Sequence, residues 1–426
     1  MILSKLVKKN AILEGTVVLV DQGMMSLATF SIGILVARAS SKEEYAIYVL
    51  GLSLLIPLNG IQQALVNMPV TIYLPRLHGR DHSTYLGSSM VSTVVLCMLF
   101  GLMFWIASVW GKVFLDKENM LLLSILPALL FLLVSTLLRD FMRNTLLAQL
   151  NVWASVRVNV IASLLAIVSA VAWYLAQELT FIAAFQLVAI TSGFAAAAMF
   201  WQHRAQFIID RSLFWDHFKK RWKVGKWALI NVVGYAASSQ AAYPWLLLYF
   251  TEYDNVAIFG ASFAIASALG PILRGAGAYI LPRMSHGYKD GDQYNLMRLL
   301  RKSILVLSLP YALWLLLGTA FSEEIVTLLY SNAYQGHGTL FVLLLIQATI
   351  LGIFAPLASA LQTLERTDAI TVSLIAASVV TLVLGSILIK QYGLNGAGIA
   401  SIISVSVMNG WRWYSIRKVF RQQKSA

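Results

Sequence analysis

The sequence predicts an all-α membrane protein with twelve transmembrane helices arranged in two six-helix lobes. Three observations predict this fold: an apolar composition, long apolar runs, and motifs that recur between the two halves. Of the 426 residues, 59% are hydrophobic and only 12% are charged, and the mean hydropathy is +0.74. A water-soluble protein of this composition would expose very large apolar patches. We therefore expect an integral membrane protein.

The apolar runs are each long enough to form a transmembrane helix, which needs about 20 residues to cross about 30 Å of hydrocarbon. Polar and turn-forming residues separate the runs, for example at residues 38–44, 75–84 and 391–396. The predicted helices cover residues 11–37, 45–74, 85–110, 119–138, 152–176, 179–201, 225–251, 255–281, 303–320, 338–363, 369–389 and 394–416.

The two halves of the chain share motifs. The segments at residues 46–48 and 73–76 recur at 257–259 and 279–283, Gly23 recurs as Gly234, and Leu150 recurs as Leu364. Because each half holds an even number of helices, both halves should have the same orientation, related by a pseudo-two-fold axis along the membrane normal. Two such halves in a membrane favour a transporter whose binding site lies between them.

The basic residues predict the topology. Most of the 32 Lys and Arg residues fall on one side of the predicted helices, which places both termini in the cytoplasm. We expect an N-terminal lobe at 1–201, a basic connector at 202–224 and a C-terminal lobe at 225–426. The connector mixes basic and aromatic residues, so it is predicted to be an amphipathic helix on the inner leaflet; a solvated basic linker is the alternative. Basic residues spread over many short loops argue against nucleic-acid binding.

Several motifs resemble those of a known family. Residues 21–38 followed by Ser41-Lys42-Glu43-Glu44-Tyr45-Ala46-Ile47-Tyr48 resemble the opening of polysaccharide-type flippases, and residues 322–334 and 392–400 resemble their C-terminal half. These flippases share a superfamily with multidrug and toxin extruders and lipid II flippases. The resemblance covers nearly the whole chain. It implies translocation of an undecaprenyl-diphosphate-linked oligosaccharide, such as an O-antigen or exopolysaccharide repeat unit, across the bacterial inner membrane by alternating access. Polysaccharide polymerases or glycosyltransferases would be the expected protein partners.

A lipid diphosphate requires positive charge at membrane depth, and an Arg fork matches phosphate oxygens better than Lys does. Arg274 in the eighth predicted helix is the first candidate, with Arg157 as a second; each could instead be a structural or snorkelling Arg. Polar residues on membrane helices should face a cavity or another helix. The further candidates for substrate binding are Asn59, Gln62, Gln63 and Asn67 on one stripe of the second helix, with Asn159, Asn231 and Gln240.

Charged residues elsewhere suggest two more roles. Arg139 and Arg143, which flank Asp140, could form a patch where the diphosphate first binds, or could be ordinary positive-inside anchors. Glu14 and Asp21 lie seven residues apart on one face of the first helix, where Asp21 could couple transport to Na+ or H+ or pair with an Arg. Lipid II flippases usually carry arginines on this helix, a departure that argues against lipid II as the cargo.

Other classes of protein are less well supported. The sequence contains no glycine-rich phosphate loop, so it gives no indication of direct use of ATP. No His/Cys cluster has metal-ligand spacing, and we expect no cofactor. A membrane glycan polymerase or ligase would need a catalytic constellation, and the outer loops hold too few candidate residues for one. The strongest rival is a cation-coupled multidrug exporter of the same superfamily, with Asp21 as the coupling site.

Overall fold

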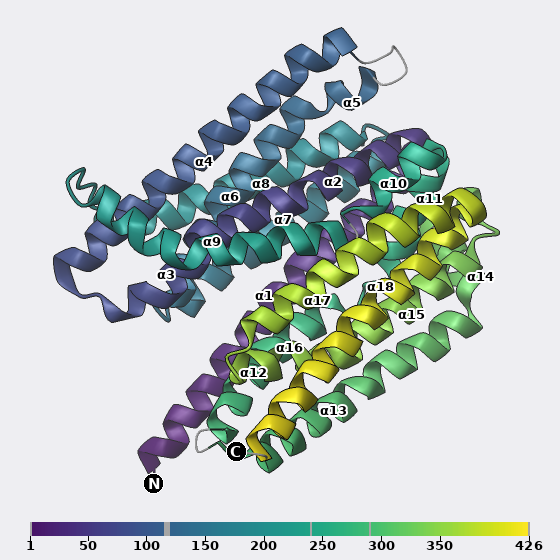
Figure 1. The fold of residues 1–426 in the computed structure, drawn as a ribbon. Coiled ribbons are helices and arrows are strands. Elements are labelled where there is room, and N and C mark those ends of the chain that lie inside the picture. Colours follow the sequence, from purple (N-terminus) through teal and green to yellow (C-terminus); the bar gives the residue numbers. More distant parts are fainter. Residues whose placement is uncertain (1, 115–119, 239–240, 289–290, 425–426) are drawn as a thin grey trace. The chain divides into compact units, whose positions relative to one another are not determined.

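The computed structural model describes residues 2–114, 120–238, 241–288 and 291–424, and within these ranges it leaves the side chains of Glu14 and Arg274 undescribed. Every regular element in this part of the chain is helical (Figure 1). The predicted all-α membrane fold is confirmed. The long helices carry apolar side chains on their outer faces as well as inside, for example Val168 on α7, which is 63% exposed. A helix that is apolar all round belongs in lipid or in a core.

The chain divides into two compact lobes. The first lobe comprises Met1–Ser40 and Gly51–Val232, and the second comprises Ser41–Leu50 and Val233–Ala426. The division therefore differs from a simple cut at the connector, because the first turns of α2 belong to the second lobe and most of α9 belongs to the first. Two helices thus contribute residues to both lobes.

The first half of the chain contains six membrane spans, some of which are bent or interrupted. The elements are α1 (Ile2–Ala39), α2 (Lys42–Gln62) continued by η1 (Gln63–Asn67), α3 (Met68–Tyr73) and η2 (Leu74–Arg76), then α4 (Gly79–Phe114), α5 (Met120–Ser124), α6 (Leu126–Ala148), α7 (Val152–Leu175), α8 (Phe181–His203) and η4 (Arg204–Gln206). Buried residues of α3, α4, α6 and α8 form the core of the first lobe around Phe141, Met142 and Tyr85.

The second half follows the same plan with more interruptions. Its elements are α9 (Phe214–Ser238), α10 (Tyr243–Phe250), α11 (Tyr253–Ala266), α12 (Gly270–Gly287), α13 (Gln293–Ala320), α14 (Ser322–Tyr330), η5 (Asn332–Tyr334), α15 (Gly338–Phe354), α16 (Pro356–Thr363), α17 (Thr367–Val379), η6 (Val380–Leu384) and α18 (Gly385–Lys424). Its core gathers around Leu296, Leu300 and Leu357.

The twelve predicted spans can be followed in the described residues. Nine helical stretches are long and apolar enough to cross a membrane, and α11 with α12 form a tenth that is bent by 54°. The last of the nine stretches, Thr367–Gln422, contains two helices because Gly393 breaks it with a φ of 55° and a ψ of −130°. The remaining predicted span, at residues 225–251, falls on parts of α9 and α10, which are separated in part by residues outside the described ranges.

The internal repeat is visible in the turns as well as in the sequence. Leu150, before α7, and Glu365, before α17, both have a left-handed backbone, with φ of 60° and 57°. In each turn the amide of the next residue donates a hydrogen bond to the carbonyl five residues earlier, at 2.9 Å. Both turns therefore end a helix by the same hydrogen-bonding pattern. The structural partner of Leu150 is Glu365, one residue beyond the Leu364 predicted from sequence.

Two of the family-like motifs meet inside the second lobe. The ring of Tyr45, at the start of α2, lies 6.1 Å from the ring of Tyr330 and 6.2 Å from that of Tyr334. Lys42 pairs with Asp254 at 3.6 Å, and Val49 packs against Gly260 so closely that no side chain would fit there. The segment at residues 41–48 is therefore a docking element whose partners come from α11, α14 and η5.

The third family-like motif, at residues 392–400, makes a close helical turn. Gly393 supplies the left-handed backbone that favours glycine. A β-carbon at Gly396 would overlap the carbonyl of Leu388, since the backbones of the two helical segments on either side of Gly393 approach each other closely. Both glycines are thus required by geometry.

We predict that Gly396→Ala lowers the stability of the protein by about 1–3 kcal/mol or more, as overpacking does in a close-packed interior. The matched control is Gly410→Ala on the same helix, where a β-carbon meets open space. Thermal unfolding of both variants in detergent, followed by size-exclusion chromatography, measures the difference. Equal stability of the two variants would contradict the close approach at Gly396.

Candidate functional site

A buried ion pair lies inside the first lobe. Asp21 on α1 is 0% exposed, and Arg143 on α6 is 9% exposed. Nε and Nη2 of Arg143 both donate to Oδ2 of Asp21, at 2.9 and 2.8 Å. Removing a carboxylate and a guanidinium from water is costly, and only good geometry with further hydrogen bonds offsets this cost. The pair therefore fixes α1 against α6.

A second guanidinium lies one helical turn away. Nε and Nη2 of Arg139 donate to Oδ1 of Asp140 at 3.2 Å, and its Nη1 donates to Oγ of Ser192 on α8 at 3.0 Å. Asn159 on α7 is buried near the carboxylate of Asp21, and its Nδ2 donates to Oγ of Ser155 at 3.4 Å. Helices α1, α6, α7 and α8 thus contribute to one ionic cluster, which consists of Asp21, Arg139, Asp140, Arg143, Asn159 and Ser192.

This cluster joins residues that the sequence analysis assigned to separate roles. Asp21 was predicted as a coupling carboxylate, Arg139 and Arg143 as a patch for the diphosphate, and Asn159 as a substrate ligand. The alternative that Asp21 pairs with an Arg is what the structure shows. The cluster holds two carboxylates and two guanidiniums. An anion can compete with the carboxylates for the guanidiniums, and a proton or a cation can compete with Arg143 for Asp21.

The polar stripe predicted on the second span is divided by a π-helical turn. Gln62 is buried and donates to the carbonyl of Leu137 on α6 at 2.7 Å. Asn67, at the end of η1, is also buried and donates to the side-chain oxygens of Gln62 and Gln63, at 3.4 and 3.2 Å. Gln63 is exposed, and Asn59 is partly buried. The wide turn brings the side chain of Asn67 within hydrogen-bonding distance of both Gln62 and Gln63.

The other predicted ligands lie apart from the cluster. Arg157 is exposed, and its Nε donates to the carbonyl of Trp153 one turn earlier, at 3.1 Å. Asn231 is partly buried on α9. Gln240 and the side chains of Glu14 and Arg274 lie outside the described residues, so their roles stay predictions.

A buried Arg that the sequence analysis missed lies on α9. Arg221 is only 1% exposed. Its Nη1 donates to Oγ of Ser88 at 2.8 Å and to Oγ of Ser89 at 3.1 Å, and its Nη2 donates to Oγ of Ser92 at 2.7 Å. The sequence analysis counted Arg221 among the basic residues that face the membrane surface. The signal that could have distinguished Arg221 from the neighbouring lysines is the group of three serines, Ser88, Ser89 and Ser92, close together on α4.

The histidine one turn before Arg221 shares this environment. A ring nitrogen of His217 lies 3.1 Å from Oγ of Ser88. Burial, with a smaller contribution from the nearby charge of Arg221, lowers the pKa of His217. His217 is therefore neutral at pH 7, and the positive charge at this contact comes from Arg221.

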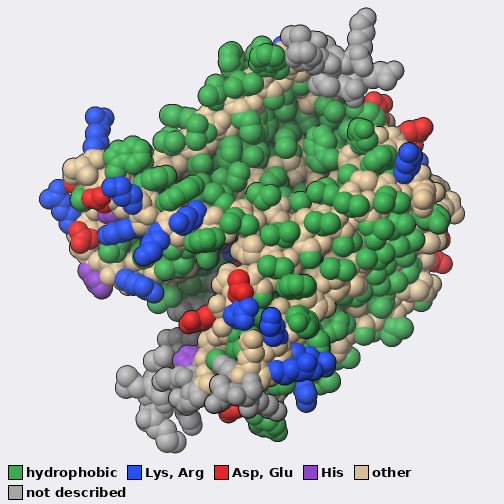
Figure 2. Space-filling view, in the orientation of Figure 1, with side chains coloured by type: hydrophobic (Ala, Val, Ile, Leu, Met, Phe, Trp, Pro, Cys, Tyr) green, Lys and Arg blue, Asp and Glu red, His purple; other side chains and the backbone are tan. Residues whose placement is uncertain are grey.

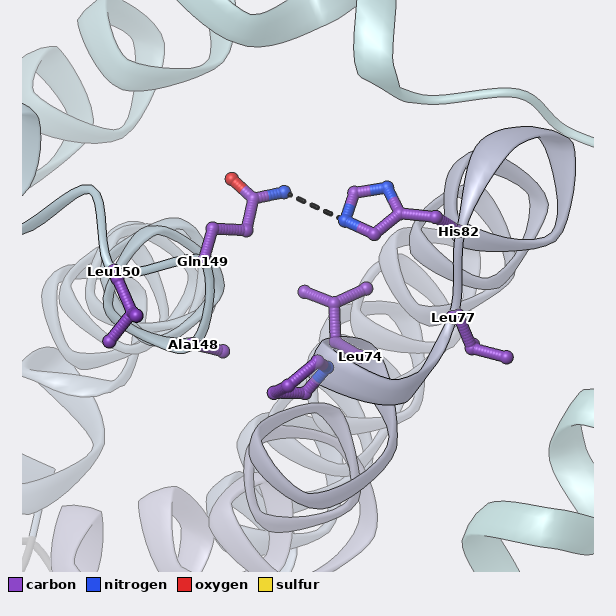
Figure 3. Close-up of a pocket in the computed structure, with 7 residues that line it drawn as sticks. Leu74, Leu77, His82, Ala148, Gln149 and Leu150 are labelled. Atoms are coloured by element: carbon purple, nitrogen blue, oxygen red, sulfur yellow. Dashed lines mark hydrogen bonds between the residues drawn. The ribbon is translucent and has the colours of Figure 1, made fainter.

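A small pocket opens at one end of the first lobe, where α6 ends and α4 begins (Figure 3). Its volume is about 310 Å³, and Nε2 of Gln149 lies 3.3 Å from Nε2 of His82 at its edge. The lining residues are Leu74, Pro75, Leu77, His82, Ala148, Gln149 and Leu150. None of the predicted ligands lines this pocket. No group of acidic, His and Cys residues in the described ranges has an arrangement that could hold a metal ion.

Comparison with known proteins places the fold. No protein-family model matches the sequence, and no curated protein matches it. Solved structures of low sequence identity do match over nearly the whole chain. An inward-facing multidrug resistance MATE family transporter of the MOP superfamily is similar with a TM-score of 0.75, at 15% identity, over 93% of this chain and 96% of that one.

Two further solved structures share this fold. The lipid II flippase MurJ, in an inward closed conformation, gives a TM-score of 0.68 at 12% identity over 95% of this chain and 87% of its own. A MOP superfamily transporter from Pyrococcus furiosus, described as having a binding pocket of reverse polarity, gives a TM-score of 0.65 at 14% identity. The match covers 94% of this chain and 95% of that one. The protein is therefore a multi-pass membrane protein with the fold of the MOP superfamily transporters.

We predict that breaking the Asp21–Arg143 pair from either side destabilises the protein. Arg143→Ala leaves a buried carboxylate without its counterion, which costs about 3–5 kcal/mol. The double variant Asp21→Asn/Arg143→Gln should lose less than the sum of its single changes, because the two residues interact directly. Chemical unfolding in detergent measures Arg143→Ala, the double variant and its two single changes, Asp21→Asn and Arg143→Gln. Arg80→Gln, which breaks only the exposed pair with Asp210, is the control with little effect; additive losses at Asp21 and Arg143 would refute the coupling.

Proposed function

We propose that the protein is a flippase that moves a polyprenyl-diphosphate-linked oligosaccharide from the cytoplasmic to the outer face of the bacterial inner membrane, with both termini cytoplasmic. One observation carries the proposal: two arginines lie within the apolar first lobe, and the buried carboxylate beside them is already paired with Arg143. The charges of the cluster balance, and its two guanidiniums offer hydrogen-bond donors that a diphosphate can take from the carboxylates. The fold shared with a lipid II flippase supports the same class of cargo.

The mechanism follows from the cost of an unpaired charge. A diphosphate offers several oxygens in a geometry that suits the forks of Arg139 and Arg143 better than single carboxylate oxygens do. When the cargo takes Arg143, Asp21 loses its counterion inside the lobe. A buried carboxylate cannot stay ionised without a partner, so it takes up a proton or Na+. Cargo binding and cation uptake would then be coupled through this one side chain.

The second lobe is expected to contribute further ligands. Arg274 stays our candidate there for the diphosphate, and the glycan would bind to polar groups. Arg157, whose guanidinium is exposed on α7, is better suited to an interfacial role than to the buried cluster. The polyprenyl tail would remain in lipid during translocation.

A second candidate function is a cation-coupled multidrug exporter. The fold shared with MATE transporters and the buried carboxylate on α1 favour it. Its difficulty is electrostatic, since a cationic drug would have to approach Asp21 past two guanidiniums. Loss of the gene distinguishes the two: a flippase loss removes surface polysaccharide and accumulates lipid-linked oligosaccharide inside the cell, whereas an exporter loss leaves the glycan intact and causes drug sensitivity.

We predict that Arg139→Gln lowers the rate of translocation by about tenfold or more, because a hydrogen bond to a charged group contributes about 1.5–3 kcal/mol. Proteoliposomes loaded with polyprenyl-diphosphate oligosaccharide, probed with an impermeant glycosidase, report the rate. Asp21→Asn should retain cargo binding but lose the dependence of transport on a proton or Na+ gradient. Arg80→Gln, at the exposed surface, should transport like the wild type. Full activity of Arg139→Gln would exclude this residue from the path of the cargo.

A further inference from the structure

The first half of α9 has two chemically different faces. His217, Arg221 and Gly225, each four residues from the next, are buried against the first lobe. Gly225 lies so close to the π-helical turn of the second span that a β-carbon there would come within 2.9 Å of the carbonyl of Ala64. Because residues four apart lie on one side of a helix, this side of α9 is committed to packing.

The opposite face is exposed and mixes tryptophan with lysine. Trp215 is 64% exposed and Trp227 is 65% exposed, with Trp222 between them at 44%. The exposed lysines on this face and its edges are Lys219, Lys220, Lys223 and Lys226. Tryptophan together with basic residues is typical of a helix at the boundary between lipid and water.

The aromatic side chains on α9 are ordered among themselves. The rings of Phe214 and Phe218 stack at 6.5 Å, and those of Phe218 and Trp222 stack at 6.2 Å. Nζ of Lys226 lies 5.4 Å from the ring centre of Trp227. Stacking restricts these side chains before any ligand binds, so the face loses less conformational freedom on binding than a flexible linker would.

The surroundings of this face are also basic. Lys and Arg side chains gather at the end of the first lobe where α4 begins and α9 starts (Figure 2). Arg204 lies over the exposed ring of Trp201 at 4.1 Å. Asp216 is 3.9 Å from Lys219, in an exposed pair that leaves both groups accessible to water. The resulting positive field favours a surface of negative charge.

The first half of α9 is fixed to α4 by hydrogen bonds from Arg221. Arg221 bonds to Ser88, Ser89 and Ser92 of α4, and these serines precede the long apolar run of that helix, which begins at Val94. The first half of α9 is therefore fixed to the polar beginning of α4, next to the apolar run, where the boundary between hydrocarbon and lipid headgroups is expected. A soluble acidic partner would not need exposed tryptophan at this depth.

We propose that this face of α9 binds the phosphate headgroups of anionic phospholipids in the leaflet predicted to be cytoplasmic. The lysines pair with the phosphates, and the tryptophans enter the boundary between headgroups and acyl chains. Each basic residue at an anionic membrane surface strengthens binding roughly fivefold. This binding site is independent of the proposed cargo, because it requires only bulk phospholipid.

The test measures lipid binding to the full-length protein in detergent by native mass spectrometry. Phosphatidylglycerol is the anionic probe, and phosphatidylcholine is the neutral one. Replacing Lys219, Lys220, Lys223 and Lys226 together by Gln should weaken binding of phosphatidylglycerol by about tenfold or more, with little change for phosphatidylcholine. Since these lysines are exposed, the variant should unfold at the wild-type temperature.

The matched control removes the same charge from the second lobe, through Arg298→Gln, Arg301→Gln, Arg417→Gln and Lys418→Gln, all at exposed positions. This variant should bind phosphatidylglycerol nearly as well as the wild type. Equal weakening in both variants, or no weakening in the α9 variant, would overturn the proposal. Trp215→Ala combined with Trp227→Ala should weaken the binding of both lipids, because the tryptophans act on the apolar boundary; unchanged binding would remove them from the site.

Discussion

The cost of burying a guanidinium in an apolar interior shapes both lobes of this protein. Each buried Arg needs hydrogen-bond acceptors, and the chain supplies them in different ways. Arg143 has the carboxylate of Asp21, Arg221 has three serine hydroxyls, and Arg412 in the second lobe donates to Oγ of Ser373 at 3.1 Å. A carboxylate partner can be protonated or displaced, whereas a set of hydroxyls cannot change its charge. Of the three arginines, only Arg143 therefore has a partner that can respond to ions.

This difference separates two kinds of buried Arg in the first lobe. Arg143 joins α6 to α1 through a carboxylate, which can change its charge, and Arg139 joins α6 to α8 through Ser192. The contact of Arg221 with α4 instead fixes one helix to another and leaves the lysines of α9 free for the membrane surface. Arg221 and the lysines of α9 look alike in the sequence, yet Arg221 is buried and the lysines are exposed.

Much of the fold could be predicted from the sequence. Twelve apolar runs and the repeated motifs suffice for the number of spans and for the doubling, because length and composition alone decide whether a helix fits the bilayer. Asp21 could be recognised as unusual for the same reason. Its partner could not be predicted, because Arg143 lies 122 residues away in the sequence. Helical periodicity shows which residues of one helix share a face, but it does not show which other helix packs there.

Three features of the structure were not predicted from the sequence. The stripe on the second span assumed a regular α-helix, whereas the structure has a π-helical turn at Gln63–Asn67, through which Asn67 reaches both Gln62 and Gln63. Arg221 was grouped with its neighbouring lysines because charge, and not helical face, decided the assignment. The predicted boundary at residues 202–224 assumed that lobes begin and end between helices, yet α2 and α9 each contribute to both.

Helices α2 and α9 each have residues in both lobes. Tyr45, near the start of α2, packs against Tyr330 and Tyr334 of the second lobe, and α2 continues from Gly51 into the first lobe. At Gly51, the first residue of α2 that belongs to the first lobe, even a methyl group would press on Leu129 and Phe185 at 3.0 Å, so the packing of that lobe leaves no room for a larger residue where the helix enters it.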